Sequence, residues 1–279
     1  MSTLDSTTTT SVGIVAGAIV LALVLYALAR AIIAPRLSDD TKPLASSVIA
    51  RIGVLHGLIL AVVFAAQLYQ YYELREDVRR EAEAVSNLSS SMQLYGAPQD
   101  TVDRFEARLA DYVHNVTTRE WRNLGTARTL SVQAKFAGAL IQETLLDLHP
   151  QSPRQETLRA SMVEDLKTVN RLRHERLAAA NQVLSPFVWI AAILGFSLMS
   201  VLFGIYRITP LSVSCVAAFA VYNGVVFALI HGLAHPFDPP ANLSPAPFEL
   251  LLDGPLGTLV SSPSGAPAGP AEAGAVSAN

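Results

Sequence analysis

The chain has 279 residues, of which 51% are hydrophobic and 15% are charged, and its formal net charge is −3. Such a composition is too apolar for an ordinary soluble protein of this length, so we predict a multi-span membrane protein. The charge balance gives no basic excess of the kind that nucleic-acid binding requires, and with a single cysteine the sequence cannot form an intrachain disulfide.

Four apolar runs are long enough to cross a membrane, since about 20 helical residues span the ~30 Å hydrocarbon layer. None of them contains Asp or Glu, which counts against a proton-driven stator or energy-transducing scaffold. The first lacks the basic start of a secretory signal peptide, so we expect it to remain as a span. The predicted spans are residues 12–29, 48–72, 183–206 and 211–234.

Residues 73–184 differ from these runs, because charges of both signs recur and apolar residues return at helical spacing. We expect helices over 75–94, 101–116 and 130–148 and from Pro153 onward. The predicted fold class is therefore an all-α membrane protein with four transmembrane helices and a helical extramembrane region between the second and third spans. The expected divisions are 1–72 (N-terminal tail and spans 1 and 2), 73–184 (helical region), 185–234 (spans 3 and 4), 235–260 (post-membrane segment) and 261–279 (disordered tail rich in Pro, Ala, Gly and Ser).

Four spans put both termini and the helical region on one side of the bilayer. Lys and Arg beside the spans favour the cytoplasmic side for that region, in a plasma (inner) membrane.

Several short signatures occur in a fixed order relative to the four spans. V-x-x-E-A follows the second span, a Tyr and a Glu-Trp pair lie in the helical region, two Arg precede a Pro-x-x-Trp at the third span, and Pro-Phe follows the fourth. Taken together they resemble the bestrophin-like family over residues 12–252, although Asp238 stands where that family usually has a small residue. The residues that carry the resemblance are Val78, Glu81, Ala82, Tyr112, Trp121, Arg173, Arg176, Pro186, Trp189, Pro236 and Phe237.

The resemblance implies a homo-oligomeric ring, by analogy with bestrophins a pentamer, in which the second span lines a pathway for small anions such as chloride. It implies a cytoplasmic helical region. The acidic calcium clasp of bestrophins has no counterpart that transfers residue by residue, and we predict neither a metal site nor a cofactor.

One stripe of the second span has polar ends and an apolar middle, as a pore gated by dewetting would have. The alternative is that its apolar residues pack against other spans. The candidate pore-lining residues are His56, Leu60, Val63, Phe64, Gln67 and Tyr71.

Other polar residues also have two interpretations. His56 could make conduction depend on pH or could hydrogen-bond a neighbouring span, and Arg51 could select anions or extend to the interface. Asn223 is expected to join membrane helices by a hydrogen bond. Glu81 and Arg176 are candidates for an ion pair between the helical region and the base of the bundle, against the alternative that each is a solvated surface charge.

No enzyme signature is found, so we predict a protein that is not an enzyme. The function predicted is a passive anion channel or channel-like membrane protein whose partners are the lipid bilayer, further copies of itself and small anions. The alternative is a non-conducting sensor or scaffold that binds a ligand or partner through residues 73–184.

Overall fold

The computed structural model describes residues 2–32, 42–182, 184–238, 242–254 and 256. Within these ranges the structure is helical and contains no strand. The helices are α1 (Ser2–Ile32), α2 (Lys42–Tyr95), α3 (Gln99–Asn115), η3 (Val116–Glu120, a π-helical turn), α4 (Trp121–Thr126), α5 (Val132–Asp147), α6 (Pro153–Asn181), α7 (Pro186–Leu202), η4 (Phe203–Ile205, a 3₁₀ turn), α8 (Pro210–Leu233) and α9 (Ala246–Asp253).

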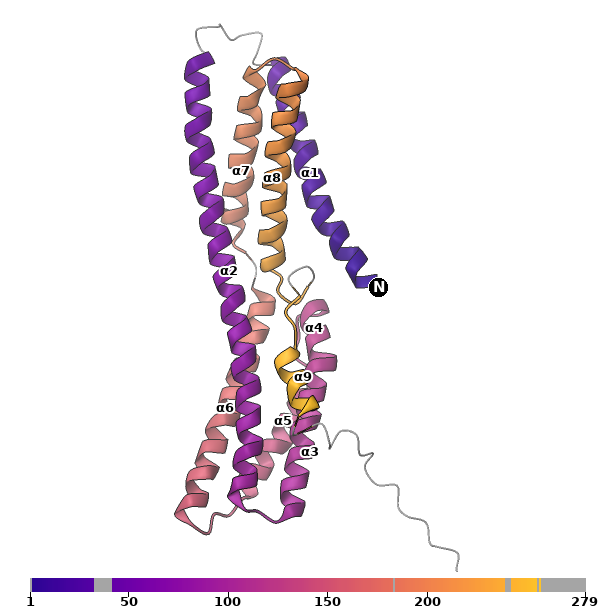
Figure 1. Ribbon diagram of the computed structural model, residues 1–279, viewed down its shortest axis with the longest axis vertical. Coiled ribbons are helices and arrows are strands. Elements are labelled where there is room, and N and C mark those ends of the chain that lie inside the picture. The colour runs from indigo at the N-terminus through magenta and orange to yellow at the C-terminus, as the bar shows by residue number, and fades with distance from the viewer. Residues whose placement is uncertain (1, 33–41, 183, 239–241, 255, 257–279) are drawn as a thin grey trace, which may run out of the picture.

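The molecule is a rod made of two helical bundles stacked end to end, and α2 runs the length of both (Figure 1). Helices α1, α7 and α8 lie to one side of one half of α2 and form the membrane bundle with it. Helices α3 to α6 and α9 form the soluble layer with the other half. Within the described residues, four helices are long and apolar enough to cross a membrane, which agrees with the four predicted spans.

The long α2 joins the predicted span over 48–72 to the helix expected over 75–94 without a break. It has 54 residues and ends at Tyr95, where Gly96 takes a positive φ of 76° that favours glycine. The predicted post-membrane segment at 235–260 contains a short helix, α9. Residues 33–41, between the first two predicted spans, and the predicted tail at 261–279 lie outside the described residues.

Local sequence signals explain where several helices begin. Proline, which lacks an N–H donor, stands at the first position of α6, α7 and α8. Ser152 caps α6 by accepting from the Gln155 N–H, and Thr209 and Ser212 form a reciprocal capping box at α8. Only residues 182–185 separate the end of α6 from Pro186, which opens α7.

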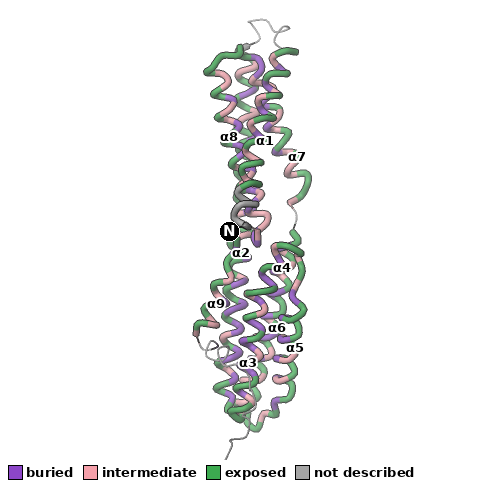
Figure 2. Tube along the Cα trace, turned by 90° about the vertical axis from the view of Figure 1, so that its right-hand side faces the viewer, coloured by how far each residue is buried: buried purple, intermediate pink, exposed green. Residues whose placement is uncertain are grey.

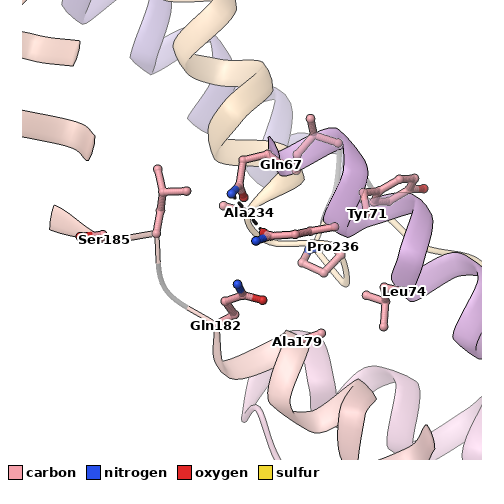
Figure 3. A pocket seen from close by; sticks show the side chains of 11 residues that line it. Gln67, Tyr71, Leu74, Ala179, Gln182, Ser185, Ala234 and Pro236 are labelled. Atoms are coloured by element: carbon pink, nitrogen blue, oxygen red, sulfur yellow. Dashed lines mark hydrogen bonds between the residues drawn. The ribbon is translucent and has the colours of Figure 1, made fainter. Parts of the chain in front are cut away.

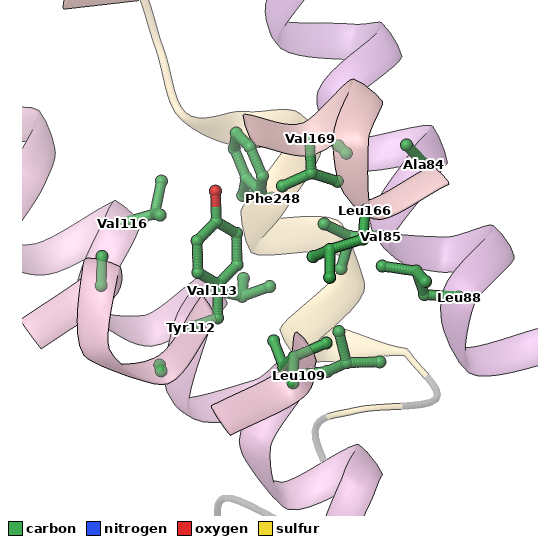
Figure 4. Packing of buried hydrophobic residues seen from close by; sticks show 14 of the residues in the cluster. Ala84, Val85, Leu88, Leu109, Tyr112, Val113, Val116, Leu166, Val169 and Phe248 are labelled. Carbon is green, nitrogen blue, oxygen red and sulfur yellow. The ribbon is translucent and has the colours of Figure 1, made fainter. Parts of the chain in front are cut away.

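Each bundle has its own apolar core. In the soluble layer, side chains of α2, α3, α6 and α9 interdigitate around Leu88, Leu109 and Phe248 (Figure 4). In the membrane bundle, small residues Ala18 and Ala22 of α1 allow close contact with α8. Buried positions follow the inward faces of both bundles, and outward faces of the membrane helices are largely exposed (Figure 2).

The contact between α1 and α8 depends on Gly224. A Cβ atom added there would lie 2.9 Å from Cα of Val15, a backbone atom that cannot move without separating the two helices. We predict that Gly224→Ala costs about 1–3 kcal/mol of stability, as overpacking does. Thermal unfolding of the protein in detergent would measure this loss.

The matched control is Gly17→Ala in α1, where an added Cβ meets no atom within 4 Å. This variant should unfold at the wild-type temperature or slightly above it, because Ala favours a helix over Gly by up to about 1 kcal/mol. Equal effects of the two substitutions would contradict the described packing of α1 on α8.

Candidate functional site

Two polar residues in the middle of the membrane bundle bond to each other. Nε2 of His56 in α2 lies 2.9 Å from Oδ1 of Asn223 in α8, and the Asn223 amide also donates to the Phe219 carbonyl. Gly195 of α7 makes room for the imidazole, because a Cβ there would overlap Nδ1 of His56. The structure therefore confirms the hydrogen-bonding role predicted for Asn223 and shows His56 joined to a neighbouring span.

The predicted pore stripe faces the subunit's own α7 and α8. His56, Leu60 and Gln67 are only 4–7% exposed, while Val63 and Phe64 are partly buried in the membrane core. For His56, Leu60 and Gln67 this burial favours packing within the chain, the alternative that the sequence had left open. Pore lining by the stripe stays an untested prediction. Tyr71, the last of the stripe, is partly buried against the soluble core.

The opposite face of α2 is exposed within the described part of the chain. Leu55, Leu58, Val62 and Tyr69 recur at helical spacing on it and are 59–68% exposed. Arg51 is exposed as well and continues the same row toward the start of the span. This outer face is an unbroken apolar strip with one guanidinium at its end.

A set of buried charged side chains lies in the soluble layer, just below the membrane bundle. Four side chains, Glu81 of α2, Glu120 of η3 and Arg173 and Arg176 of α6, form what we call the buried charge cluster. All four are at most 3% exposed. The predicted Glu81–Arg176 ion pair is confirmed, with 2.7 Å between Oε2 and Nη1.

Glu120 is the hub of this cluster. Its Oε1 accepts from Nη2 of Arg176 at 2.6 Å, and Nε of Arg173 lies 3.0 and 3.1 Å from its two oxygens. The backbone N–H of Ser131 donates to Oε2, and the Ser131 carbonyl accepts from Arg173. One carboxylate thus ties η3, α6 and the start of α5 together.

Aromatic side chains close the cluster. The Tyr112 hydroxyl donates to Oε1 of Glu81 at 2.8 Å. The guanidinium carbon of Arg176 lies 5.1 Å from the centre of the Trp121 ring and 5.6 Å from that of Phe248, which are cation–π distances. Nε1 of Trp121 donates to the Leu243 carbonyl, so the post-membrane segment is fastened to the same place.

Titration of the cluster follows from these contacts. Burial alone would raise the pKa of Glu120, but the hydrogen bond from Arg173 and the charges of Arg176 and Arg173 outweigh it and hold the pKa below its ordinary value. The pKa of Tyr112 is raised well above its usual range, first by burial and then by the negative charge of Glu81. Glu120 is therefore ionised and Tyr112 neutral at physiological pH.

Most residues of the family signatures meet at this cluster. Val78 and Ala82 are buried beside Glu81 on α2, and Phe237 packs edge-on against Trp121 with ring centres 5.6 Å apart. Pro236 is buried in the same segment. Pro186 and Trp189 instead open α7, where Trp189 packs edge-on against Phe227 of the membrane core.

Our interpretation of the sequence did not identify Glu120 as the partner of the two arginines. It also missed that Phe248 and Ser131 contact the cluster. A signal was present in the sequence. Exposed acidic residues in this region pair with basic residues three or four positions away, as in Glu76–Arg79 and Glu164–Lys167. No residue of the cluster has an opposite charge at that spacing in the sequence. Charges without local partners in a helical region were the candidates for long-range pairing.

The fold and this cluster define a class: a four-span helical membrane protein with a helical layer locked to its base. The family model for the bestrophin-like domain matches residues 16–248. The chain belongs to the bestrophin-like family and is a channel-like membrane protein rather than an enzyme.

Solved structures show the same fold. A single-residue variant of a bacterial bestrophin homologue from Klebsiella pneumoniae is 12% identical, with a TM-score of 0.66 over 90% of this chain and 99% of that one. A structure described as a membrane protein with a single substitution is 14% identical, with a TM-score of 0.63 over 84% of this chain and 96% of that one. No curated protein matches the sequence.

Breaking the buried charge cluster should destabilise the soluble layer strongly. We predict that Glu120→Gln lowers stability by about 3–5 kcal/mol, because it leaves two buried guanidinium groups without their shared counter-charge. Trp121 fluorescence during denaturation would report the loss. In the matched control Glu164→Gln, which removes one exposed ion pair with Lys167, the loss should stay below about 1 kcal/mol. Equal losses in the two variants would contradict the burial described.

The lowered pKa of Glu120 predicts a pH dependence. Its contribution to stability is complete above the unfolded-state pKa of about 4.3 and is lost as the pH falls through the lower folded-state pKa. The stability difference between wild type and Glu120→Gln should therefore be constant near neutral pH and shrink in acid, where the wild-type carboxyl also becomes neutral. Denaturation of both proteins between about pH 3 and 7 tests this, and a difference that does not shrink would contradict it.

Proposed function

We propose that the chain is a passive anion channel that acts as a homo-oligomeric ring, with α2 lining the shared pore. The observation that carries the proposal is the division of α2 into two faces. One face is buried against α7 and α8, and the other is apolar, exposed and without a partner in the subunit.

A ring of subunits gives this free face a role. If the α2 helices surround an axis, Leu55, Leu58 and Val62 form successive apolar rings, and such a constriction gates ions by dewetting. The proposed lining is therefore this outer strip and not the stripe from His56 to Tyr71. By analogy with bestrophins the ring has five copies.

Charge supports anions as the permeant species. Arg51 continues the strip, so a ring would set several guanidinium groups at one mouth, and the four spans contain no Asp or Glu that would attract cations. In this proposal the membrane is the plasma (inner) membrane, and the soluble layer and both termini are cytoplasmic. Chloride-type ions would move down their gradient, since the sequence has no nucleotide-binding motif to drive transport.

The test is chloride flux in liposomes that contain the purified protein. Leu58→Ala with Val62→Ala should raise flux several-fold by widening and wetting the constriction, and Arg51→Gln should reduce the preference for chloride over cations. The control is Leu194→Ala, an equally large truncation on the exposed side of α7, which should leave flux unchanged. Absence of flux in all forms, or the same change in the control, would contradict the proposal and favour a non-conducting scaffold.

A further inference from the structure

A cavity of about 290 Å³ lies where the soluble layer meets the membrane bundle. Its walls come from four places: the end of the membrane part of α2, the end of α6, the start of α7 and the end of α8. The lining residues with polar side chains are Gln67, Gln70, Tyr71, Gln182 and Ser185, and no Lys, Arg, Asp or Glu lines it. The volume is at the small end of ligand pockets and suits a molecule of roughly ten non-hydrogen atoms.

Hydrogen bonding in the cavity is incomplete. Nε2 of Gln67 donates to Oε1 of Gln70 at 3.1 Å, and neither side chain makes another hydrogen bond within the described part of the chain. Whichever way round the two amides are assigned, their single bond leaves one carbonyl oxygen without a partner. Gln67 is only 7% exposed, and Figure 3 shows its amide and that of Gln182 turned toward each other across the cavity. An amide oxygen that lines the cavity without a partner in the protein is free to accept a hydrogen bond from a bound donor.

The charge distribution around the cavity favours a hydrogen-bond donor that carries a positive charge. The last turns of α6 and α8, at Ala179 and at Leu233, both reach the lining, whereas only α7 begins there. Carbonyl groups at a helix C-terminus carry partial negative charge, so two such ends outweigh one N-terminus.

A groove next to the cavity adds a full negative charge. It shares Gln70 and Gln182 with the cavity and continues along α2 and α6. Two of its acids are paired, Asp77 with Arg80 and Glu175 with Arg171, but Glu73 has no ion-pair partner among the described residues. The groove therefore carries one uncompensated carboxylate at the cavity's side.

We propose that this cavity binds a small organic molecule through a primary ammonium group. The ammonium would donate to the free carbonyl of the Gln67–Gln70 pair while Glu73 supplies the counter-charge. The short apolar body would contact Leu74 and Leu184. A soluble amine or the ethanolamine headgroup of a lipid could supply that group, because the cavity lies at the end of the spans. The site lies inside one subunit and does not depend on the proposed conduction.

Calorimetry on the full-length protein in detergent tests the proposal with three probes of similar size: benzylamine, benzyl alcohol and benzoate. Benzylamine should bind at least about tenfold more tightly than the neutral or the anionic probe. Benzoate binding as tightly as benzylamine, or no benzylamine binding, would overturn the proposal, whereas chloride flux would be unaffected by either result.

Substitutions locate the site. Gln67→Leu and Glu73→Gln should each weaken benzylamine binding, the first by about tenfold because a hydrogen bond to a charged group is lost. Gln182→Leu, at an exposed position, serves if Gln67→Leu fails to fold. Gln142→Leu and Glu143→Gln on the exposed side of α5 are the matched controls and should bind as wild type. Unchanged affinity in the folded cavity variants would overturn the proposal.

Nanodiscs distinguish the two sources of the ammonium group. If the lipid headgroup occupies the cavity, benzylamine should bind more weakly in discs that contain phosphatidylethanolamine than in discs of phosphatidylcholine alone. Equal affinity in the two discs identifies a soluble amine as the occupant. Benzylamine binding that Gln67→Leu leaves intact in both discs would place the amine elsewhere and overturn the proposal.

Discussion

The two carboxylates and two guanidinium groups buried below the membrane bundle constrain the rest of the structure. Charges removed from water are costly unless each is paired and hydrogen-bonded. Here the partners come from four segments: α2, η3, α6 and the turn before α5. The ion pairs form in one arrangement of these segments, and this arrangement fixes the soluble layer on α2. Since α2 is continuous, whatever moves the soluble half of that helix is transmitted to the half in the membrane.

The membrane bundle obeys a different constraint, because lipid provides no hydrophobic force between helices. Close approach of α1 and α8 relies on small residues such as Ala18 and Gly224, and the His56–Asn223 bond joins α2 to α8. These contacts use one face of α2 and leave the other free. In a subunit built this way, one side of α2 is packed and the other side has no partner. A subunit in a ring whose central axis is lined by α2 helices would have the same arrangement.

The sequence predicted much of this architecture, because spans and helix ends depend on residues that are close together in the sequence. Four apolar runs, proline at helix starts and Gly96 after Tyr95 set the spans and helix ends. The face of α2 that turns inward could not be predicted this way. Helical periodicity groups His56, Leu60 and Gln67 on one stripe, but which stripe packs inside the subunit depends on Asn223, 167 residues away. Glu120 was missed for the same reason, although its lack of a local partner was visible.

The central claim is that the outer face of α2 surrounds an axis shared by several copies of the chain. Spin labels on single cysteines test it most directly, with the only native cysteine, Cys215, replaced by serine. Distances between labels of different copies at Leu58→Cys should be short and sharply distributed, and those at Leu194→Cys on α7 should be clearly longer. Longer distances at Leu58→Cys than at Leu194→Cys, or no distances between copies at all, would contradict the account.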